Sequence, residues 1–170
     1  MNILILFPTL NGKVIIVSTI NFESIKNIAV DPDNEFNNII SLNVIESSQT
    51  LIVATPNKIV SISPKEVLSK DYEVRDIIVN KEDIYVATID GQLIKLSASL
   101  NEVKSKKYKY AKFHALAFTD SLYAVESQGF LVNINSDFSK DSVYDFSFDN
   151  EERMIAIGNR IYFDSKYITL

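Results

Sequence analysis

His114 is the only histidine in the 170-residue chain, so it is the one side chain suited to general-base catalysis near neutral pH. It lies in an alternating stretch, where Phe113 and Ala115 are predicted on one face and His114 and Leu116 on the other. A lone histidine in such a strand is more often a hydrogen-bonded structural residue than a ligand or a base. The chain contains no cysteine and no second histidine, so a transition-metal site lacks its usual ligands.

Motifs for acyl transfer and nucleotide hydrolysis are absent from the sequence. No Gly-x-Ser-x-Gly elbow presents a serine, and the four glycines are too widely spaced to form a phosphate-binding loop. A Ser-His-Asp triad would have to use His114 as its base. The sequence therefore predicts no catalytic, cofactor-binding or metal-binding residue, and no cofactor.

Two acidic groups deserve comparison with known carboxylate chemistry. Asp31-Pro32-Asp33-Asn34-Glu35 begins like a calcium loop, with oxygen ligands at its first, third and fifth positions. Phe36 occupies the place of the sharp-turn glycine and Leu42 that of the bidentate glutamate, so we interpret this stretch as a solvated loop between strands. Asp145 and the acidic residues of 149–152 could supply paired carboxylates, but a turn between strands explains 149–152 more simply.

Five lysines and two tyrosines are interleaved between Lys104 and Lys112. Such a run could contact phosphates and stack bases, or dock an acidic partner. It could equally be an outer strand, on which lysines discourage edge-to-edge pairing. We favour the outer strand, because 17 basic residues against 22 acidic ones give a net charge of −5 and argue against a general attraction to nucleic acid or anionic membranes.

The elements that must position these residues are strands. Five segments consist of an apolar strand, a short polar or glycine turn and a second apolar strand, as expected for hairpins. Their strand pairs are Ile3–Phe7 with Val14–Ser18, Leu51–Thr55 with Ile59–Ile62, Ile84–Thr88 with Leu93–Leu96, Leu122–Glu126 with Phe130–Ile134, and Met154–Ile157 with Ile161–Phe163. The second strands recur about every 37 residues, which indicates an internal repeat.

Further strands flank these hairpins. Strands are predicted before the last four hairpins at Ile39–Ile45, Asp76–Val79, Phe113–Phe118 and Tyr144–Phe148, and more polar strands follow the first four at Ile25–Val30, Tyr72–Val74, Glu102–Tyr108 and Asp141–Val143. A repeat of about 40 residues with four strands is typical of a propeller blade. A β-sandwich or barrel also has strands at such intervals, so it stays the structural alternative.

One segment departs from the strand pattern. Ser63-Pro64-Lys65-Glu66 has a serine, a following proline and a glutamate three residues on, as in a helical capping box. Either one or two helical turns or a tight turn containing Pro64 satisfies this pattern.

The hairpins at Ile84–Leu96 and Leu122–Ile134 resemble the central hairpins of WD40-like and quinoprotein-like propeller repeats. The Trp-Asp and Gly-His signatures of true WD40 repeats are missing, and the chain has no tryptophan with which to form the docking motif of quinoprotein dehydrogenases. The resemblance therefore implies the fold without quinone chemistry. In its Ile-, Asn- and Lys-rich repeats the chain is also similar to propeller-type accessory proteins of bacterial periplasmic nitrate reduction systems.

We accordingly predict an all-β, β-propeller-like array of about four to five four-stranded blades, either complete or part of a larger propeller. The units of this single domain are expected at about 1–36, 37–74, 75–111, 112–143 and 144–170.

The predicted function is that of a non-catalytic protein-binding, scaffold or accessory module, without enzymatic activity. Two alternatives remain: a catalytic or metal-handling propeller whose loops bring together Asp31, Asp33, His114 or Asp145, and a fragment of a larger propeller with no function of its own. The partner is expected to be a protein, with no nucleic acid and no membrane insertion, and an open array would self-associate through its exposed edges. No signal peptide is recognised at Met1–Pro8, which predicts a cytoplasmic protein as the chain stands, or a periplasmic one if it ends a longer secreted precursor.

Overall fold

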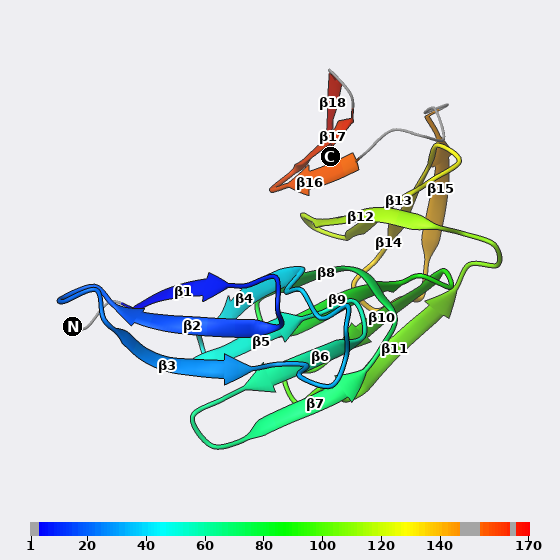
Figure 1. The fold of residues 1–170 in the computed structure, drawn as a ribbon. Helices are drawn as coiled ribbons and strands as arrows, with labels where there is room; N and C mark the ends of the chain where they lie inside the picture. Colours follow the sequence, from blue (N-terminus) through cyan, green and yellow to red (C-terminus); the bar gives the residue numbers. More distant parts are fainter. Residues whose placement is uncertain (1–3, 147–153, 164–165) are drawn as a thin grey trace. The chain divides into compact units, whose positions relative to one another are not determined.

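The structure, a computed structural model, describes residues 4–146, 154–163 and 166–170, and all regular elements in these ranges are β-strands. These residues form five antiparallel sheets, three with four strands and two with three, and each sheet is a simple meander (Figure 1). The predicted all-β, blade-like architecture is therefore confirmed. The described ranges contain no helix long and apolar enough to span a membrane. The chain divides into two compact units, Met1–Tyr72 and Glu73–Leu170.

Unit 1 contains two sheets, whose apolar faces meet around Val14, Val53 and Val60. The first sheet consists of β1 (Leu4–Pro8), β2 (Lys13–Ser18) and β3 (Ser24–Ala29), and the second of β4 (Ser41–Ile45), β5 (Thr50–Ala54), β6 (Lys58–Ile62) and β7 (Val67–Asp71). The predicted hairpins coincide with β1–β2 and β5–β6, although Ile3 lies outside the described residues.

Unit 2 contains three sheets. Their strands are β8 (Val74–Asn80), β9 (Asp83–Thr88), β10 (Gln92–Leu96) and β11 (Glu102–Lys107); β12 (Phe113–Phe118), β13 (Leu122–Glu126), β14 (Phe130–Ile134) and β15 (Asp141–Asp145); and β16 (Met154–Ile157), β17 (Arg160–Phe163) and β18 (Lys166–Thr169). The first strands of the two four-stranded sheets, β8 and β12, pack against each other, and β12 also contacts β16 of the next sheet. First strands that lie side by side are the arrangement of neighbouring propeller blades.

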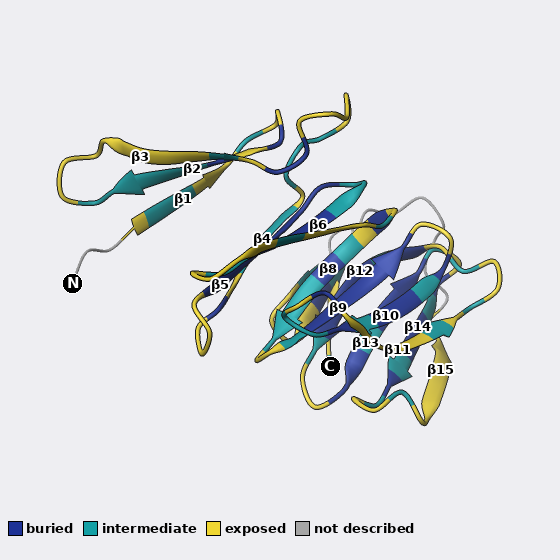
Figure 2. Ribbon diagram, turned by 90° about the horizontal axis from the view of Figure 1, so that it is seen from below, coloured by how far each residue is buried: buried dark blue, intermediate teal, exposed yellow. Residues whose placement is uncertain are grey.

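Burial within unit 2 follows the strand order. The middle strands β9, β10, β13 and β14 are mostly buried, whereas β11 and β15 are exposed along nearly their whole length (Figure 2). Apolar side chains on both faces of the middle strands form the clusters between neighbouring sheets, one around Tyr85 and Leu116 and another around Val125 and Ile161. The outer strands thus close each blade while contributing little to the core.

One backbone hydrogen bond recurs in all five sheets. In each case the first residue after the outer strand donates its N–H to the carbonyl of the turn residue that precedes the neighbouring strand, which is paired with the outer one. The pairs are Val30 with Gly12 (2.8 Å), Tyr72 with Asn57 (3.0 Å), Tyr108 with Gly91 (2.9 Å), Phe146 with Gly129 (2.9 Å) and Leu170 with Asn159 (2.9 Å). This bond extends the outer ladder of each sheet by one step.

Of the two conformations left open for Ser63–Glu66, the structure has the tight turn, because the Ser63 N–H donates to the Glu66 carbonyl (2.9 Å) and closes the β6–β7 hairpin. Two predicted strands differ from the structure. The outer strand of the sheet that contains this hairpin is Val67–Asp71, and the prediction of Tyr72–Val74 was wrong. The strand expected at Tyr144–Phe148 was also misplaced, because Tyr144 and Asp145 belong to β15, while residues 147–148 lie outside the described ranges.

Candidate functional site

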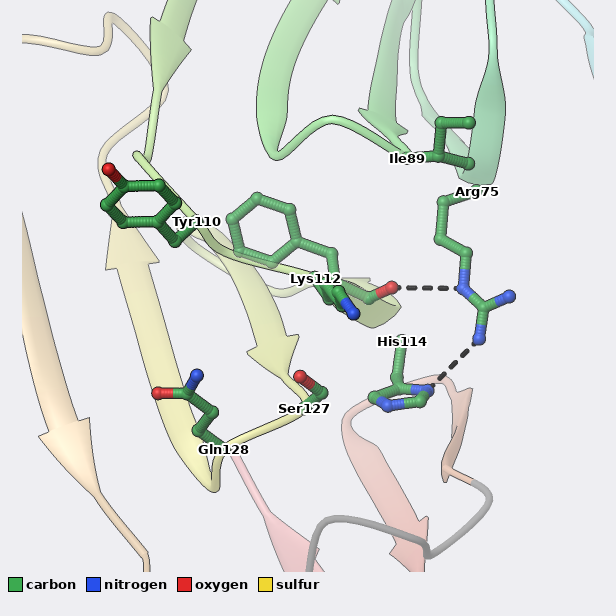
Figure 3. A pocket seen from close by; sticks show the side chains of 8 residues that line it. Arg75, Ile89, Tyr110, Lys112, His114, Ser127 and Gln128 are labelled. Atoms are coloured by element: carbon green, nitrogen blue, oxygen red, sulfur yellow. Dashed lines mark hydrogen bonds between the residues drawn. The ribbon is translucent and has the colours of Figure 1, made fainter.

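The topology gathers connections at one end of each sheet. Because neighbouring strands are antiparallel, the start of a first strand and the end of the second lie at the same end. The connector from the previous sheet and the turn before the third strand therefore meet there. At this end of the β12–β15 sheet lies a pocket of about 550 Å³ (Figure 3). It is lined by Arg75, Ile89, Tyr110, Lys112, Phe113, His114, Ser127 and Gln128.

Arg75 and His114 enter this pocket from equivalent β-bulges. In β8 the register shifts between Val74 and Asp76, and in β12 it shifts between Phe113 and Ala115. A bulge adds one residue to a strand and redirects its side chain. The predicted alternation around His114 was wrong for this reason, since Phe113 packs in the same cluster as Leu116 whereas Ala115 joins the other cluster.

Arg75 fixes the tautomer of the His114 ring. The Arg75 Nε donates to the Phe113 carbonyl at 3.1 Å, and its Nη2 lies 3.1 Å from the His114 Nδ1 (Figure 3). Because a guanidinium is always protonated and only donates, Nδ1 must be the acceptor and the ring proton lies on Nε2. Burial and the positive charge of Arg75 lower the pKa of His114 below 6.5, against a smaller opposing effect of Glu126. The expectation of a hydrogen-bonded His114 is therefore confirmed.

Glu126 links two segments next to the pocket by hydrogen bonds. Its side chain is only 5% exposed, and it accepts hydrogen bonds from the backbone N–H groups of Lys112 (3.1 Å) and Gln128 (2.8 Å) and from the Ser127 hydroxyl (3.1 Å). The Ser127 N–H in turn donates to the Lys112 carbonyl at 2.9 Å. Glu126 thus fastens the β13–β14 turn to the connector that enters β12.

That connector, residues 108–112, is pressed against Gly91. A Cβ built on Gly91 would lie 2.5 Å from the Ala111 carbonyl oxygen and 2.7 Å from that of Tyr108, so only glycine permits this approach. The connector bends back with Tyr110 at a φ of 69°, a left-handed conformation uncommon for a bulky residue. Tyr110 is 79% exposed and lines the pocket.

Asp76 braces the same end of the sheets. Its carboxylate accepts the Leu116 N–H at 2.6 Å and the Ile77 N–H at 2.9 Å, and so joins β8 directly to β12. Burial raises the pKa of Asp76, and these hydrogen bonds offset only part of the effect. Asp76 therefore joins the two strands that carry Arg75 and His114, without lining the pocket itself.

The calcium-like loop holds a structural carboxylate. Asp31 is completely buried in unit 1, with its oxygens 2.7 Å from Asn34 Nδ2, 3.1 Å from Thr55 Oγ1 and 3.2 Å from Lys58 Nζ. Burial acts to raise the pKa of Asp31, but the hydrogen bonds from these three side chains outweigh it and lower the pKa. Asp33 points to solvent. The expected solvated loop is found at residues 33–35, but the expectation was wrong for Asp31, whose carboxylate is buried and paired with the Lys58 ammonium group.

Within unit 2, Asp145 is not placed next to His114. Asp145 ends β15, and two strands separate β15 from β12, which carries His114. Asp149, Glu151 and Glu152 lie outside the described residues. Asp31 and Asp33 belong to unit 1, whereas His114 and Asp145 belong to unit 2. Among the residues that the structure describes, no group of three or more His, Asp or Glu side chains is placed to hold a metal ion.

The lysine run divides between two roles. Lys106 and Lys107 lie on the outer strand β11, as predicted, and pair with Asp141 (2.7 Å) and Asp90 (2.5 Å). Lys112 lies beyond the strand in the connector and lines the pocket. The interpretation of the run as an outer strand therefore holds for β11 and misses the contribution of Lys112 to the site.

The geometry around His114 does not favour a general base. A base must accept a proton, but the Arg75 cation beside Nδ1 opposes an imidazolium at His114. The Ser127 hydroxyl donates to Glu126, so it is not activated by His114. What remains exposed is a set of donors, the cations of Arg75 and Lys112, and the apolar surfaces of Ile89 and Tyr110.

The chain is similar in structure and in sequence to known proteins. No protein-family model matches the chain. The crystal structure of BamB from Moraxella catarrhalis superposes with a TM-score of 0.66 at 12% identity, over 95% of this chain and 51% of BamB. The plasminogen-binding protein PgbB from two strains of Helicobacter pylori is 29% identical over 182 residues and 28% identical over 181, in each case covering 99% of this chain and 33% of PgbB.

The chain thus spans about one third of the curated relatives that it matches and about half of the BamB chain. The similarity to accessory proteins of nitrate reduction stays a prediction, whereas the quinoprotein-like repeat architecture is confirmed. The chain has a BamB-like, quinoprotein-like β-propeller structure and is a distant homologue of PgbB.

Proposed function

We propose that the chain is a non-catalytic protein-binding module of the β-propeller type, and that it binds its partner at the connector end of unit 2. The observation that carries this proposal is the pocket itself, in which two cations and two exposed apolar side chains surround a histidine held neutral by Arg75. Charged groups together with exposed aromatic and aliphatic surface are what protein interfaces use.

The rigidity of the lining supports the same role. Arg75 is anchored at two atoms, Glu126 fastens the turn to the connector, and Gly91 holds the connector down. Side chains that are already ordered lose less conformational entropy when a partner binds. The site is therefore prepared for binding before any partner arrives.

Plasminogen is the first partner to test, because the PgbB relatives are named for binding it. The chain aligns with one third of PgbB, so a binding measurement also reports whether the aligned third is sufficient.

The test is surface plasmon resonance with the purified chain immobilised and plasminogen as the analyte, with serum albumin as the matched control. We expect saturable binding of plasminogen and none of albumin. Plasminogen binding no stronger than that of albumin would contradict the assignment of this partner. Activity of the chain as a hydrolase on ester or phosphate substrates, abolished by His114→Gln, would contradict a non-catalytic role.

A further inference from the structure

We propose that the connector-end pocket recognises a carboxylate, carried by an acidic side chain of a protein segment in which an apolar residue lies beside the acid. This inference deepens the protein-binding function proposed above and rests on it. It names the chemistry of the partner at the pocket that Arg75, Lys112 and His114 line.

The first argument concerns the donors of Arg75. A guanidinium has five N–H groups in a rigid fork. Arg75 directs one to the Phe113 carbonyl and one to His114, which leaves three without a partner among the described residues. Since the two anchored bonds already fix the orientation of the fork, the remaining donors need no further ordering to bind a ligand. A planar fork of this kind matches a carboxylate.

The second argument concerns charge. Figure 3 shows the His114 ring next to Arg75 and, in this view, the Lys112 side chain between Arg75 and Tyr110. The His114 Nε2–H is a further donor, because Nδ1 is engaged by Arg75. Among the described residues, the lining contains no carboxylate, and Glu126, which does not line the pocket, accepts hydrogen bonds from three donors. A locally cationic site in a chain of net charge −5 indicates a specific anionic contact and not a general attraction to polyanions.

The third argument concerns the apolar rim. Ile89 is 53% exposed and Tyr110 is 79% exposed, and both line the pocket. These surfaces are suited to an aliphatic side chain next to the acid. The volume of about 550 Å³ falls within the range of about 300–1,000 Å³ that is usual for ligand pockets, enough to receive side chains of a short segment.

The test uses His114 as a reporter, because the only histidine of the chain gives one unambiguous set of imidazole signals in nuclear magnetic resonance. The probe is a terminally blocked pentapeptide with glutamate between two leucines, and its matched control has glutamine in place of glutamate. We expect the glutamate peptide to shift the His114 ring signals saturably and to raise the pKa of His114, because a bound carboxylate favours the imidazolium. The glutamine peptide should bind at least about tenfold more weakly.

Two further probes distinguish the sources of the anion. A peptide that carries its only carboxylate at the C-terminus tests whether the pocket binds a terminal carboxylate as tightly as it binds the carboxylate of a side chain. Inorganic phosphate tests for a phosphate site. Tighter binding of either probe than of the glutamate peptide would overturn the assignment to an acidic side chain.

Three variants locate the site. Arg75→Gln should weaken the glutamate peptide by at least about tenfold, and Lys112→Gln by about threefold to tenfold, because each removes one cation from the lining. Lys81→Gln removes the same charge from the β8–β9 turn, at the opposite end of the sheet, and should leave binding unchanged. If Arg75→Gln loses the amide spectrum of the folded chain, Lys112→Gln against Lys81→Gln decides the question.

The outcomes separate the two proposals. Equal binding of the glutamate and glutamine peptides, or equal weakening by Lys112→Gln and Lys81→Gln, would overturn carboxylate recognition. Plasminogen binding that persists in Lys112→Gln and Arg75→Gln would leave the protein-binding proposal standing and refute this site as its basis. Binding of the glutamate peptide without binding of plasminogen would support the site and refute plasminogen as its partner.

Discussion

Replacing Gly91 by alanine tests how the pocket is built. Two effects oppose the new methyl group. The φ of 84° at Gly91 is left-handed, which costs an ordinary residue about 1–2 kcal/mol. In addition, the Cβ would lie 2.5 Å and 2.7 Å from the carbonyl oxygens of Ala111 and Tyr108, and because both are backbone atoms the overlap is relieved only by moving the connector.

Gly158→Ala provides the matched control in the same unit. Gly158 has a φ of 60°, but a Cβ built there meets no atom within 4 Å. Its alanine variant therefore carries the backbone cost alone, reduced by about 0.4–1 kcal/mol because alanine restricts the unfolded chain. We expect a net loss of about 0.5–1 kcal/mol for Gly158→Ala. Gly91→Ala should lose about 2–4 kcal/mol, since overpacking adds about 1–3 kcal/mol.

Urea denaturation followed by far-ultraviolet circular dichroism measures both variants. The unfolding midpoints give the free energies when the slope is unchanged. Gly91→Ala should also weaken binding of the glutamate peptide, because a displaced connector carries Tyr110 and Lys112 with it. Equal destabilisation by the two variants would refute the close approach at Gly91. Unchanged peptide binding in Gly91→Ala would refute its role in positioning the pocket.

Three further outcomes are expected. Tyr108→Phe should lose about 1–2 kcal/mol of unfolding free energy, because the Tyr108 hydroxyl donates to Asp141 at 2.9 Å. Tyr72→Phe, at the equivalent position, should lose none, since the buried Tyr72 hydroxyl has no partner among the described residues; thermal melts of the pair check this. His114 should titrate below 6.5 in nuclear magnetic resonance, and Arg75→Gln should raise its pKa toward 6.5. Because the pKa of His114 is lower in the folded chain than in the unfolded chain, the unfolded chain binds more protons near this pH. The contribution of neutral His114 to the free energy of unfolding is therefore complete above pH 6.5, and it is lost as the pH falls through the folded pKa. A thermal-shift scan of divalent cations should show no selective stabilisation, and a large shift with one cation would contradict the assignment of Asp31 to a purely structural role.

The hairpins were predictable because their turns are governed by local chemistry. Gly12, Gly91 and Gly129 all adopt positive φ, as expected for the glycine of a tight turn between two apolar strands. The outer strand of the second sheet was misplaced because Val67–Asp71 is largely exposed, and an exposed strand has no apolar alternation that could mark it. Its position follows from the Ser63–Glu66 turn, which the sequence left open between two conformations.

The site was only partly predictable, because the alternation of apolar and polar residues in the sequence does not reveal where a β-bulge occurs. His114 and Lys112 were singled out by residue type, but Arg75 was not, although it lies 39 residues before His114 at the equivalent position of the repeat. An alignment of the repeats on Gly91 and Gly129 would have shown that Arg75 and His114 occupy equivalent repeat positions, to within one residue. What no alignment of repeats supplies is the register shift that turns both side chains into one pocket.

Hydrogen–deuterium exchange of the chain with and without plasminogen, followed by mass spectrometry, tests the central claim most directly. We expect new protection in the connector 108–112, at the start of β12 and in the turn between β13 and β14, with no new protection on the outer strands β11 and β15. An unchanged exchange pattern at saturating plasminogen, or protection confined to the outer strands, would contradict binding at the connector end of unit 2.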